Sequence, residues 1–120
     1  MHLNQVTVPT LDVPRAVAFY QQLGLHLIVL SPHYARFECL PEGNTFSVHL
    51  TDSLPTGEGV KVYFERDDLD DYVARLVEKG LAFEELPNDK PWQWREAHLR
   101  DPDGNHLVLY HAGDVRRFPG

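Results

Sequence analysis

The sequence predicts an α+β protein that is built from two βαβββ units and contains eight strands. The first observation is an internal repeat, because residues 5–27 align without a gap on residues 61–83 and Asp12 falls on Asp68. The second is the order of patterns in each copy, which runs from a short β-rich segment through helical spacing to three alternating segments. Each copy therefore has one helix face and one sheet face to bury.

A short β-rich run opens each copy, VTV in the first and VYF in the second, and a helix is predicted directly after it. Asp12 and Asp68 are placed to cap these helices, and Pro14 suits the first turn, where its missing N–H costs nothing. Gly24 and Gly80 end the periodic segments, as glycine does at the left-handed C′ position. The apolar residues at helical spacing are Val13, Ala16, Val17 and Tyr20 in one copy and Leu69, Tyr72, Val73 and Leu76 in the other.

Three strand candidates follow each helix, separated by turn-forming residues. They are LHLIVLS, ARFECL and TFSVHL in the first copy and AFEEL, REAHLR and HLVLYH in the second. The predicted turns lie at 31–33, 41–44, 87–89 and 101–105. We expect a single domain over 1–120, with modules at about 3–51 and 59–112, a linker at 52–58 and a C-terminal tail at 113–120.

Composition and charge exclude several classes of function. A hydrophobic content of 42% in 120 residues supports a packed core, and a net charge of −7 opposes binding to nucleic acid or to an anionic membrane. The single cysteine, Cys39, excludes an internal disulfide framework, and its neighbour Glu38 disfavours a reactive thiolate. The N-terminus does not resemble a signal peptide, so we expect a cytoplasmic protein.

Aromatic residues gather in the second copy. Trp92 and Trp94 in KPWQWRE would share one face if that segment were extended, and Tyr63 and Tyr110 add two further rings. Aromatic walls with a few polar groups are typical of small-molecule pockets, whereas two tryptophans also suit a core or a dimer contact. Both interpretations remain open from the sequence.

Three segments carry a resemblance to a known family. They are LDVPRAVAFYQQLGL, VYFERDDLDDYVARL and the turn DPDGN with its following alternating strand. Together they resemble the vicinal oxygen chelate superfamily, which includes glyoxalase I, bleomycin-resistance proteins and extradiol dioxygenases, over residues 3 to about 112. The resemblance implies a curled eight-stranded mixed sheet with a cleft, and a homodimer as the assembly.

In metal-dependent members, four ligands come from the first and last strands of the two modules. By resemblance these positions fall on Gln5, His49, Lys61 and Val108. Gln5 and His49 are acceptable metal ligands, whereas an ammonium group lacks a free lone pair and valine offers no ligand atom. The resemblance thus implies an incomplete metal site at Gln5 and His49. It also implies the loss, at Val108, of the carboxylate that moves the substrate proton in glyoxalase-like members.

Other side chains are expected in the same cleft. His106 and Tyr110 alternate with Val108 and face the same way, with His106 about 7 Å from the Val108 position. His111 is expected on the opposite face, and the face of His98 on the preceding strand is not set by the pattern. Lys61 could hold an anionic ligand oxygen or could be a solvated lysine. The predicted ligand-binding residues are Gln5, His49, Lys61, Tyr63, Trp92, Trp94, His106 and Tyr110.

Two functions from different classes follow from this pattern. The first is a small-molecule-binding protein of the glyoxalase/bleomycin-resistance type, with no cofactor, no complete catalytic metal site, and no nucleic-acid or membrane partner. The alternative is a metal-dependent lyase or isomerase resembling glyoxalase I, in which a divalent metal stabilises an enediolate. A ring-cleaving dioxygenase is the weaker form of the alternative, because it needs a fuller iron site. The sequence leaves open whether the protein is an enzyme.

Overall fold

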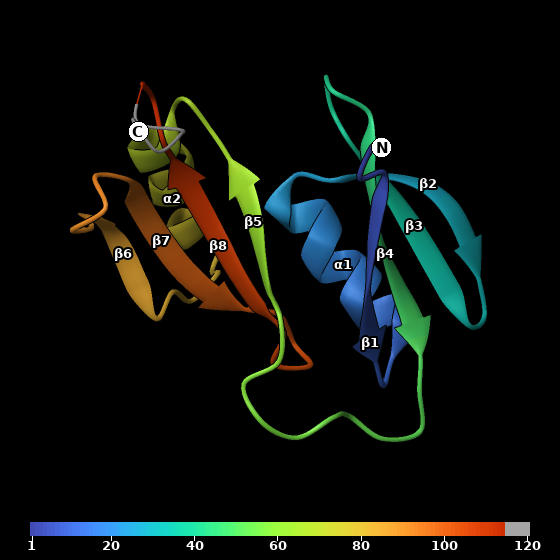
Figure 1. The fold of residues 1–120 in the computed structure, drawn as a ribbon. Coiled ribbons are helices and arrows are strands. Elements are labelled where there is room, and N and C mark those ends of the chain that lie inside the picture. The colour runs from blue at the N-terminus through green and yellow to red at the C-terminus, as the bar shows by residue number, and fades with distance from the viewer. Residues whose placement is uncertain (115–120) are drawn as a thin grey trace. The chain divides into compact units, whose positions relative to one another are not determined.

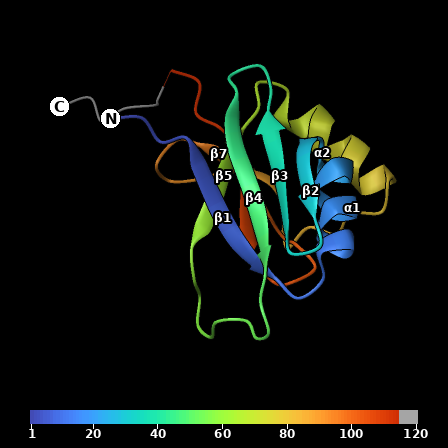
Figure 2. The same cartoon turned by 90° about the vertical axis from the view of Figure 1, so that its right-hand side faces the viewer.

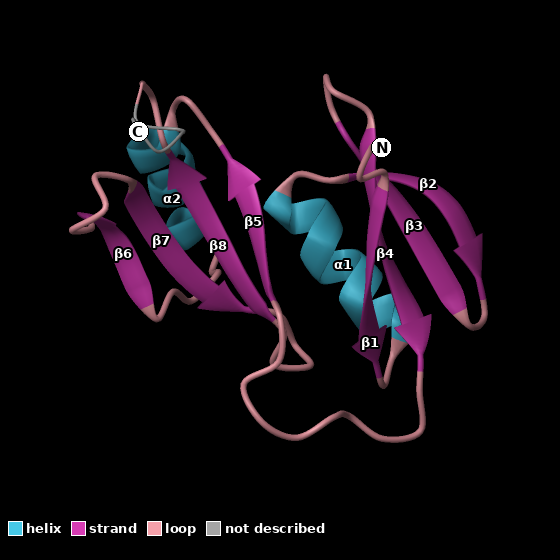
Figure 3. Cartoon of the chain, in the orientation of Figure 1, coloured by secondary structure: helices cyan, strands magenta, loops and turns pink. Residues whose placement is uncertain are grey.

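The computed structural model of the chain describes residues 1–114 and contains the predicted βαβββ order twice (Figures 1 and 3). The eight strands form two mixed sheets of four, in the orders β1-β4-β3-β2 and β5-β8-β7-β6. No helix within residues 1–114 is long and apolar enough to cross a membrane. The elements are β1 (Gln5–Thr10), α1 (Val13–Leu23), β2 (His26–Ser31), β3 (Tyr34–Cys39), β4 (Asn44–Leu50), β5 (Lys61–Glu65), α2 (Leu69–Glu78), β6 (Glu85–Asp89), β7 (Arg95–Arg100) and β8 (His106–His111).

The chain divides into two compact units. The first consists of Met1–Gly59 together with Asp101–Asn105, and the second consists of Val60–Arg100 together with the described residues from His106 onward. The predicted linker at 52–58 contains no helix or strand. Of the predicted tail, residues 115–120 lie outside the described part of the chain. The first unit is therefore discontinuous in sequence, because the turn between β7 and β8 groups with it.

Helix α1 covers one face of the first sheet, as Figure 2 shows. Asp12 caps the helix by accepting a hydrogen bond from the Arg15 amide at 3.0 Å, and Gly24 ends it in the left-handed conformation at φ 116°. The fully buried Tyr20 ring packs 4.7 Å from the Phe46 ring centre and 5.6 Å from that of Phe37. The predicted capping and the predicted burial of Tyr20 are both confirmed.

The turn Asp101–Asn105 is held by its own carboxylates. The Asp101 side chain accepts hydrogen bonds from the backbone amides of Asp103 and Asn105, both at 2.9 Å, and from the Tyr20 hydroxyl. Asp103 pairs with Arg15 at 2.7 Å and accepts the Thr10 hydroxyl. Asp101 is 5% exposed, so these donors replace the hydrogen bonds to water that its carboxylate loses on burial.

Helix α2 packs on one face of the second sheet (Figure 1). It buries Leu69, Val73 and Leu76, in agreement with the predicted spacing. Asp68 precedes the helix but forms no side-chain cap, because its carboxylate pairs with Arg66 at 2.7 Å and with Arg75 at 3.3 Å. These pairs lower the pKa of Asp68 to about 2, with the Arg66 hydrogen bond as the largest cause.

The position of β6 corrects the sequence prediction. A strand was expected at AFEEL, residues 82–86, with a turn at 87–89, whereas β6 is Glu85–Asp89. Pro87 is tolerated because β6 is the edge strand of its sheet, where a missing N–H breaks no ladder bond, and the pairing with β7 is irregular between Glu85 and Asn88. The chain turns later, where the Lys90 amide bonds the Trp94 carbonyl.

Candidate ligand-binding site

The candidate site lies on the face of the second sheet that α2 does not cover. Leu107, Val108 and Leu109 of β8 are all buried, so alternation and not burial assigns the faces: His111 lies with Asp67 beside the N-terminus of α2, and Leu107 and Leu109 share its face. His106, Val108 and Tyr110 therefore lie on the other face, as the sequence predicted. The strand register fixes the neighbours, since β5 places Lys61 beside His106 and Tyr63 beside Val108.

One half of this face is aromatic. The Trp94 ring stacks on Tyr110 with centroids 4.8 Å apart and planes 24° apart, and Tyr63 meets Tyr110 edge-on at 5.5 Å and 85°. Tyr63 is 44% exposed, so part of the aromatic surface is open to solvent. We call Tyr63, Trp94 and Tyr110 the aromatic platform. Three of the predicted ligand-binding residues are therefore brought together here.

The other half is a chain of hydrogen bonds that ends on a buried carboxylate. Glu96, 1% exposed, accepts the Trp92 indole N–H on Oε2 at 2.7 Å and lies 2.8 Å from His98 Nε2 through Oε1. The second ring nitrogen of His98, Nδ1, lies 2.8 Å from His106 Nε2. Carboxylate and imidazoles thus form one continuous chain, which we call the Glu96–His98–His106 chain.

The charges around His106 favour its neutral form. Burial is the largest cause of the lowered pKa of His106, followed by Arg100, His98 and Lys61, whereas Glu84 acts in the opposite direction. Arg100 is the Cα partner of His106 on β7, and Lys61 is its partner on β5. The side chain of Lys61 is exposed and has no ion pair or hydrogen bond within residues 1–114. Its ammonium group is therefore available to an anion.

Glu96 and His98 are site residues that the sequence analysis missed. The signal for them was present in the turn, because Arg100 pairs with His106 and the hairpin register then places His98 opposite Val108. Two-residue alternation puts Glu96 on the same face, opposite Tyr110. The hairpin register in the structure thus supplies the faces of His98 and Glu96, which the sequence pattern left open.

The segment that contains Trp92 is a turn. The sequence analysis placed Trp92 and Trp94 on one face only if this segment was extended, and that condition is not met. Gln93 has a φ of 70°, and its amide bonds the Lys90 carbonyl at 2.8 Å. Trp92 is 53% exposed, and its indole N–H still reaches Glu96. Both tryptophans therefore contribute to this site, one through its ring face and one through its nitrogen.

Gln5 and His49 belong to the first unit, and the structure does not bring them together. Gln5 pairs with Thr45 on the parallel strand β4, whereas His49 pairs with Pro9. Four residues of strand separate the two positions, a distance of about 13 Å, which one metal ion cannot span. Within residues 1–114, no group of three or more His, Cys, Asp and Glu side chains is arranged to hold a metal ion.

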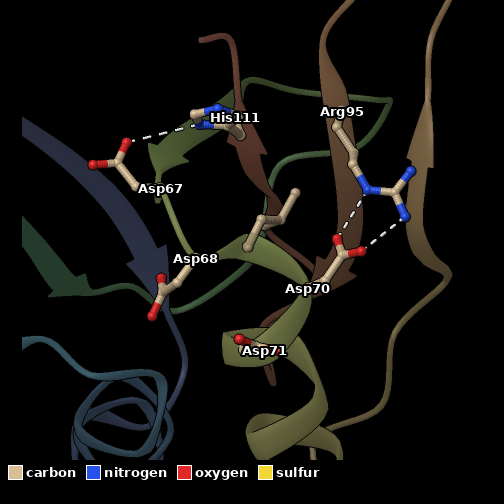
Figure 4. Close-up of a pocket in the computed structure, with 7 residues that line it drawn as sticks. Asp67, Asp68, Asp70, Asp71, Arg95 and His111 are labelled. Atoms are coloured by element: carbon tan, nitrogen blue, oxygen red, sulfur yellow. Dashed lines mark hydrogen bonds and ion pairs between the residues drawn. The ribbon is translucent and has the colours of Figure 1, made fainter.

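A separate surface hollow lies at the N-terminus of α2, on the other side of β8 (Figure 4). Arg95 pairs there with Asp70 through two hydrogen bonds of 2.9 and 3.0 Å, and His111 Nδ1 lies 3.7 Å from Asp67. His111 thus faces away from the aromatic platform, as predicted. Acidic side chains at a helix N-terminus are stabilised by the helix dipole, which accounts for this cluster.

Comparisons with known proteins place the chain in a family. The uncharacterized protein YraH of Bacillus subtilis (strain 168) is 31% identical over 125 residues, covering 92% of this chain and 98% of that protein. A glyoxalase/bleomycin resistance protein/dioxygenase from Nocardioides superposes with a TM-score of 0.81 at 24% identity, covering 100% of this chain and 88% of that one. A lactoylglutathione lyase from Agrobacterium tumefaciens superposes with a TM-score of 0.77 at 20% identity, covering 98% and 97% of the two chains.

These two solved structures show the shared fold alone. The family itself is shown by a family model that matches residues 2–109, nearly the whole chain. The chain belongs to the Glyoxalase/Bleomycin resistance protein/Dioxygenase superfamily.

Proposed function

We propose that this protein binds an aromatic small molecule on the aromatic platform and uses Lys61 to hold an anionic group of that ligand. The observation that carries the proposal is the partly exposed stack of Tyr63, Trp94 and Tyr110 beside an unpaired ammonium group. An added ring that stacks on these residues gains about 0.5–1.5 kcal/mol beyond the burial of its area.

The position of Lys61 supports an anionic ligand. It precedes Tyr63 by two residues on β5, so both side chains lie on the same sheet face. A ring over Tyr63 and Tyr110 would place a carboxylate or a similar group toward the β5 start, where Lys61 and His106 are neighbours. A charge-assisted hydrogen bond there is stronger than a neutral one.

The alternative is a metal-dependent lyase or isomerase, the class to which the lactoylglutathione lyase of Agrobacterium tumefaciens belongs by its name. The donor set does not favour this alternative, because Gln5 and His49 are separated along β1 and β4. Protein purified without a chelator should therefore contain no stoichiometric metal that depends on Gln5 and His49. Stoichiometric metal that is lost in Gln5→Ala and His49→Ala would favour the lyase.

A matched pair of probes tests the binding proposal. Para-nitrobenzoate carries a carboxylate, and para-nitroanisole is a neutral ring of similar size. Each should raise the Tm of the protein, and a ligand at about a hundred times its Kd stabilises by about 2.7 kcal/mol. Lys61→Met should reduce the effect of para-nitrobenzoate alone, whereas Lys79→Met, at the end of α2, should leave both effects unchanged.

Trp94→Leu should weaken the binding of both probes and reduce the rise in Tm that each produces, because it removes the ring that stacks on Tyr110. If neither probe raises the Tm of the unaltered protein, the aromatic platform is a packing feature and the proposal is wrong. If Lys61→Met weakens the binding of both probes equally, the lysine supports the fold and does not hold the anion.

The assembly we propose is a cytoplasmic homodimer. Strand β2 is an edge strand of its sheet and exposes Ile28, Val29 and Leu30 at 43%, 42% and 62%. An apolar edge of this kind favours pairing with a second chain. Val29→Lys should lower the native mass to that of one chain, and an unchanged dimer would show that another surface pairs.

Burial raises the pKa of the Cys39 thiol, with Glu42 and Glu38 adding to the shift, which suits an unreactive cysteine.

A further inference from the structure

The two ring nitrogens of His98 and the carboxylate of Glu96 determine where the hydrogens of the chain lie. The Trp92 indole nitrogen can only donate, so Glu96 Oε2 must accept, as an ionised carboxylate does. An ionised Glu96 also accepts from His98 Nε2–H. His98 Nδ1 is then an acceptor, and His106 must donate to it from Nε2–H.

This order leaves His106 Nδ1 as an unprotonated nitrogen at the end of the chain. No hydrogen-bond partner for it is found in the described part of the protein. His106 is half-buried and lies beside Lys61, on the face that carries the aromatic platform. The chain therefore presents a lone pair, and not an N–H, to a molecule bound there.

We propose that the ligand of this face carries a weakly acidic hydroxyl, of the phenol or enol class, and that His106 Nδ1 accepts its proton. This inference rests on the binding function proposed above and names the chemical class of the ligand. The oxygen–hydrogen bond of the ligand breaks and a bond forms between that hydrogen and His106 Nδ1. The hydrogen on His106 Nε2 passes to His98 Nδ1, and the ligand oxygen keeps the electron pair as an anion.

The product of this transfer is well placed electrostatically. The added positive charge resides on His98, whose Nε2 is 2.8 Å from the buried Glu96 carboxylate. The ligand oxyanion lies between Lys61 and the newly formed N–H of His106. Both new charges are therefore compensated. The heavy atoms of the chain do not need to move, because the His98–His106 and ligand–His106 hydrogen bonds reverse direction while His98 Nε2–H continues to donate to Glu96.

Other charged groups face His106 from each neighbouring strand. They are Lys61 on β5, Arg100 and His98 on β7, and Glu84 just before β6. The cations and burial lower the pKa of His106, so its lone pair is present at neutral pH. Lys61 and Arg100 disfavour a positive charge on the His106 imidazole but stabilise an oxyanion beside it.

The test uses para-nitrophenol, whose phenolate has a yellow absorption band, and para-nitroanisole, which has the same ring without the acidic hydrogen. At a pH where free para-nitrophenol is mostly protonated, the protein should produce the phenolate band on binding. We expect the apparent pKa of the bound phenol to fall by about one unit or more, a tenfold change in its ionisation equilibrium.

Glu96→Gln reverses the chain and should abolish the phenolate band. The glutamine oxygen must still accept from Trp92, so its NH₂ group faces His98 Nε2 and that nitrogen becomes an acceptor. His98 then donates from Nδ1, and His106 presents an N–H to the ligand. Glu78→Gln removes the same charge at the C-terminal end of α2, from a residue that is not among the groups acting on His106, and should leave the band unchanged.

His106→Phe keeps an aromatic ring at this position and provides a second variant if Glu96→Gln does not fold. It should still bind para-nitroanisole, since the aromatic platform is retained, and give no phenolate band. Binding of both probes without any phenolate band in the unaltered protein would overturn the inference and leave the binding function intact. Failure of both probes to bind would refute the binding function, and the inference with it.

Discussion

Removing the Tyr20 hydroxyl tests how the Asp101–Asn105 turn is attached to the first unit. Tyr20→Phe keeps the ring that packs between Phe37 and Phe46 and deletes only the donor to the Asp101 carboxylate. A hydrogen bond to a charged group contributes about 1.5–3 kcal/mol. Asp101 keeps its donors from Asp103 and Asn105, so we expect a loss toward the middle of this range, about 2 kcal/mol in the free energy of unfolding.

The measurement is urea unfolding followed by far-UV circular dichroism. The midpoint should fall while the slope m stays constant, because the exposed area of the unfolded chain is unchanged. Tyr34→Phe is the matched control, since Tyr34 is half-buried and its hydroxyl makes no hydrogen bond within residues 1–114, so its effect should stay within about 0.5 kcal/mol. If the two variants unfold at the same urea concentration, the buried hydrogen bond does not stabilise the turn.

Three further variants test the core, the helix cap and an ion pair. Phe37→Ala should cost about 3–5 kcal/mol in urea unfolding, because Phe37 is fully buried, and a loss below about 1 kcal/mol would contradict its place in the core. Asp12→Ala should cost about 1 kcal/mol through the lost cap on α1, measured in the same way, with no loss if the cap is not stabilising. The Asp68 carboxyl should titrate at about pH 2 by NMR, and Arg66→Gln should raise that pKa toward the ordinary value. Because the folded pKa is lowered, the stability from this ion pair is present above about pH 4 and is lost as the pH falls toward 2, and an Asp68 pKa unaffected by Arg66→Gln would refute the assignment.

Local chemistry was sufficient to predict most of the fold. Asp12 and Gly24 define the two ends of α1 through interactions within one or two turns of chain, and these do not depend on distant residues. The alternation of HLVLYH gave the two faces of β8 for the same reason. The eight strands were predicted in number, but their division into two sheets of four comes from pairing between distant segments.

Where the sequence prediction was wrong, the missing information was tertiary. Pro87 reads as a turn residue unless the strand is known to be at a sheet edge, and that position depends on which strand pairs with β7. Trp92 and Trp94 were expected to share a face only if their segment was extended. The segment is not extended, because Gln93 adopts a positive φ, a conformation that a glutamine in the sequence does not indicate.

In the candidate site, too, some residues could be predicted from local sequence and others depend on tertiary contacts. Lys61 was placed by the family resemblance, and strand alternation then predicted that Tyr63 shares its face and that Tyr110 shares the face of Val108. Glu96 was missed because a glutamate in an alternating strand usually points to solvent, and its burial depends on donors from Trp92 and His98. Whether the ligand-binding roles of all eight predicted residues are correct stays a prediction.

The discontinuous first unit limits how this protein can be divided. A fragment that ends at Gly59 contains a complete βαβββ repeat but lacks Asp101 and Asp103. In that fragment the buried Tyr20 hydroxyl loses its acceptor, and Thr10 and Arg15 lose theirs. The two repeats are alike in sequence, but they are not interchangeable halves. The Asp101–Asn105 turn follows β7 in the chain but is bonded to the first unit, so the first repeat expressed alone should be less stable than the same segment in the intact protein.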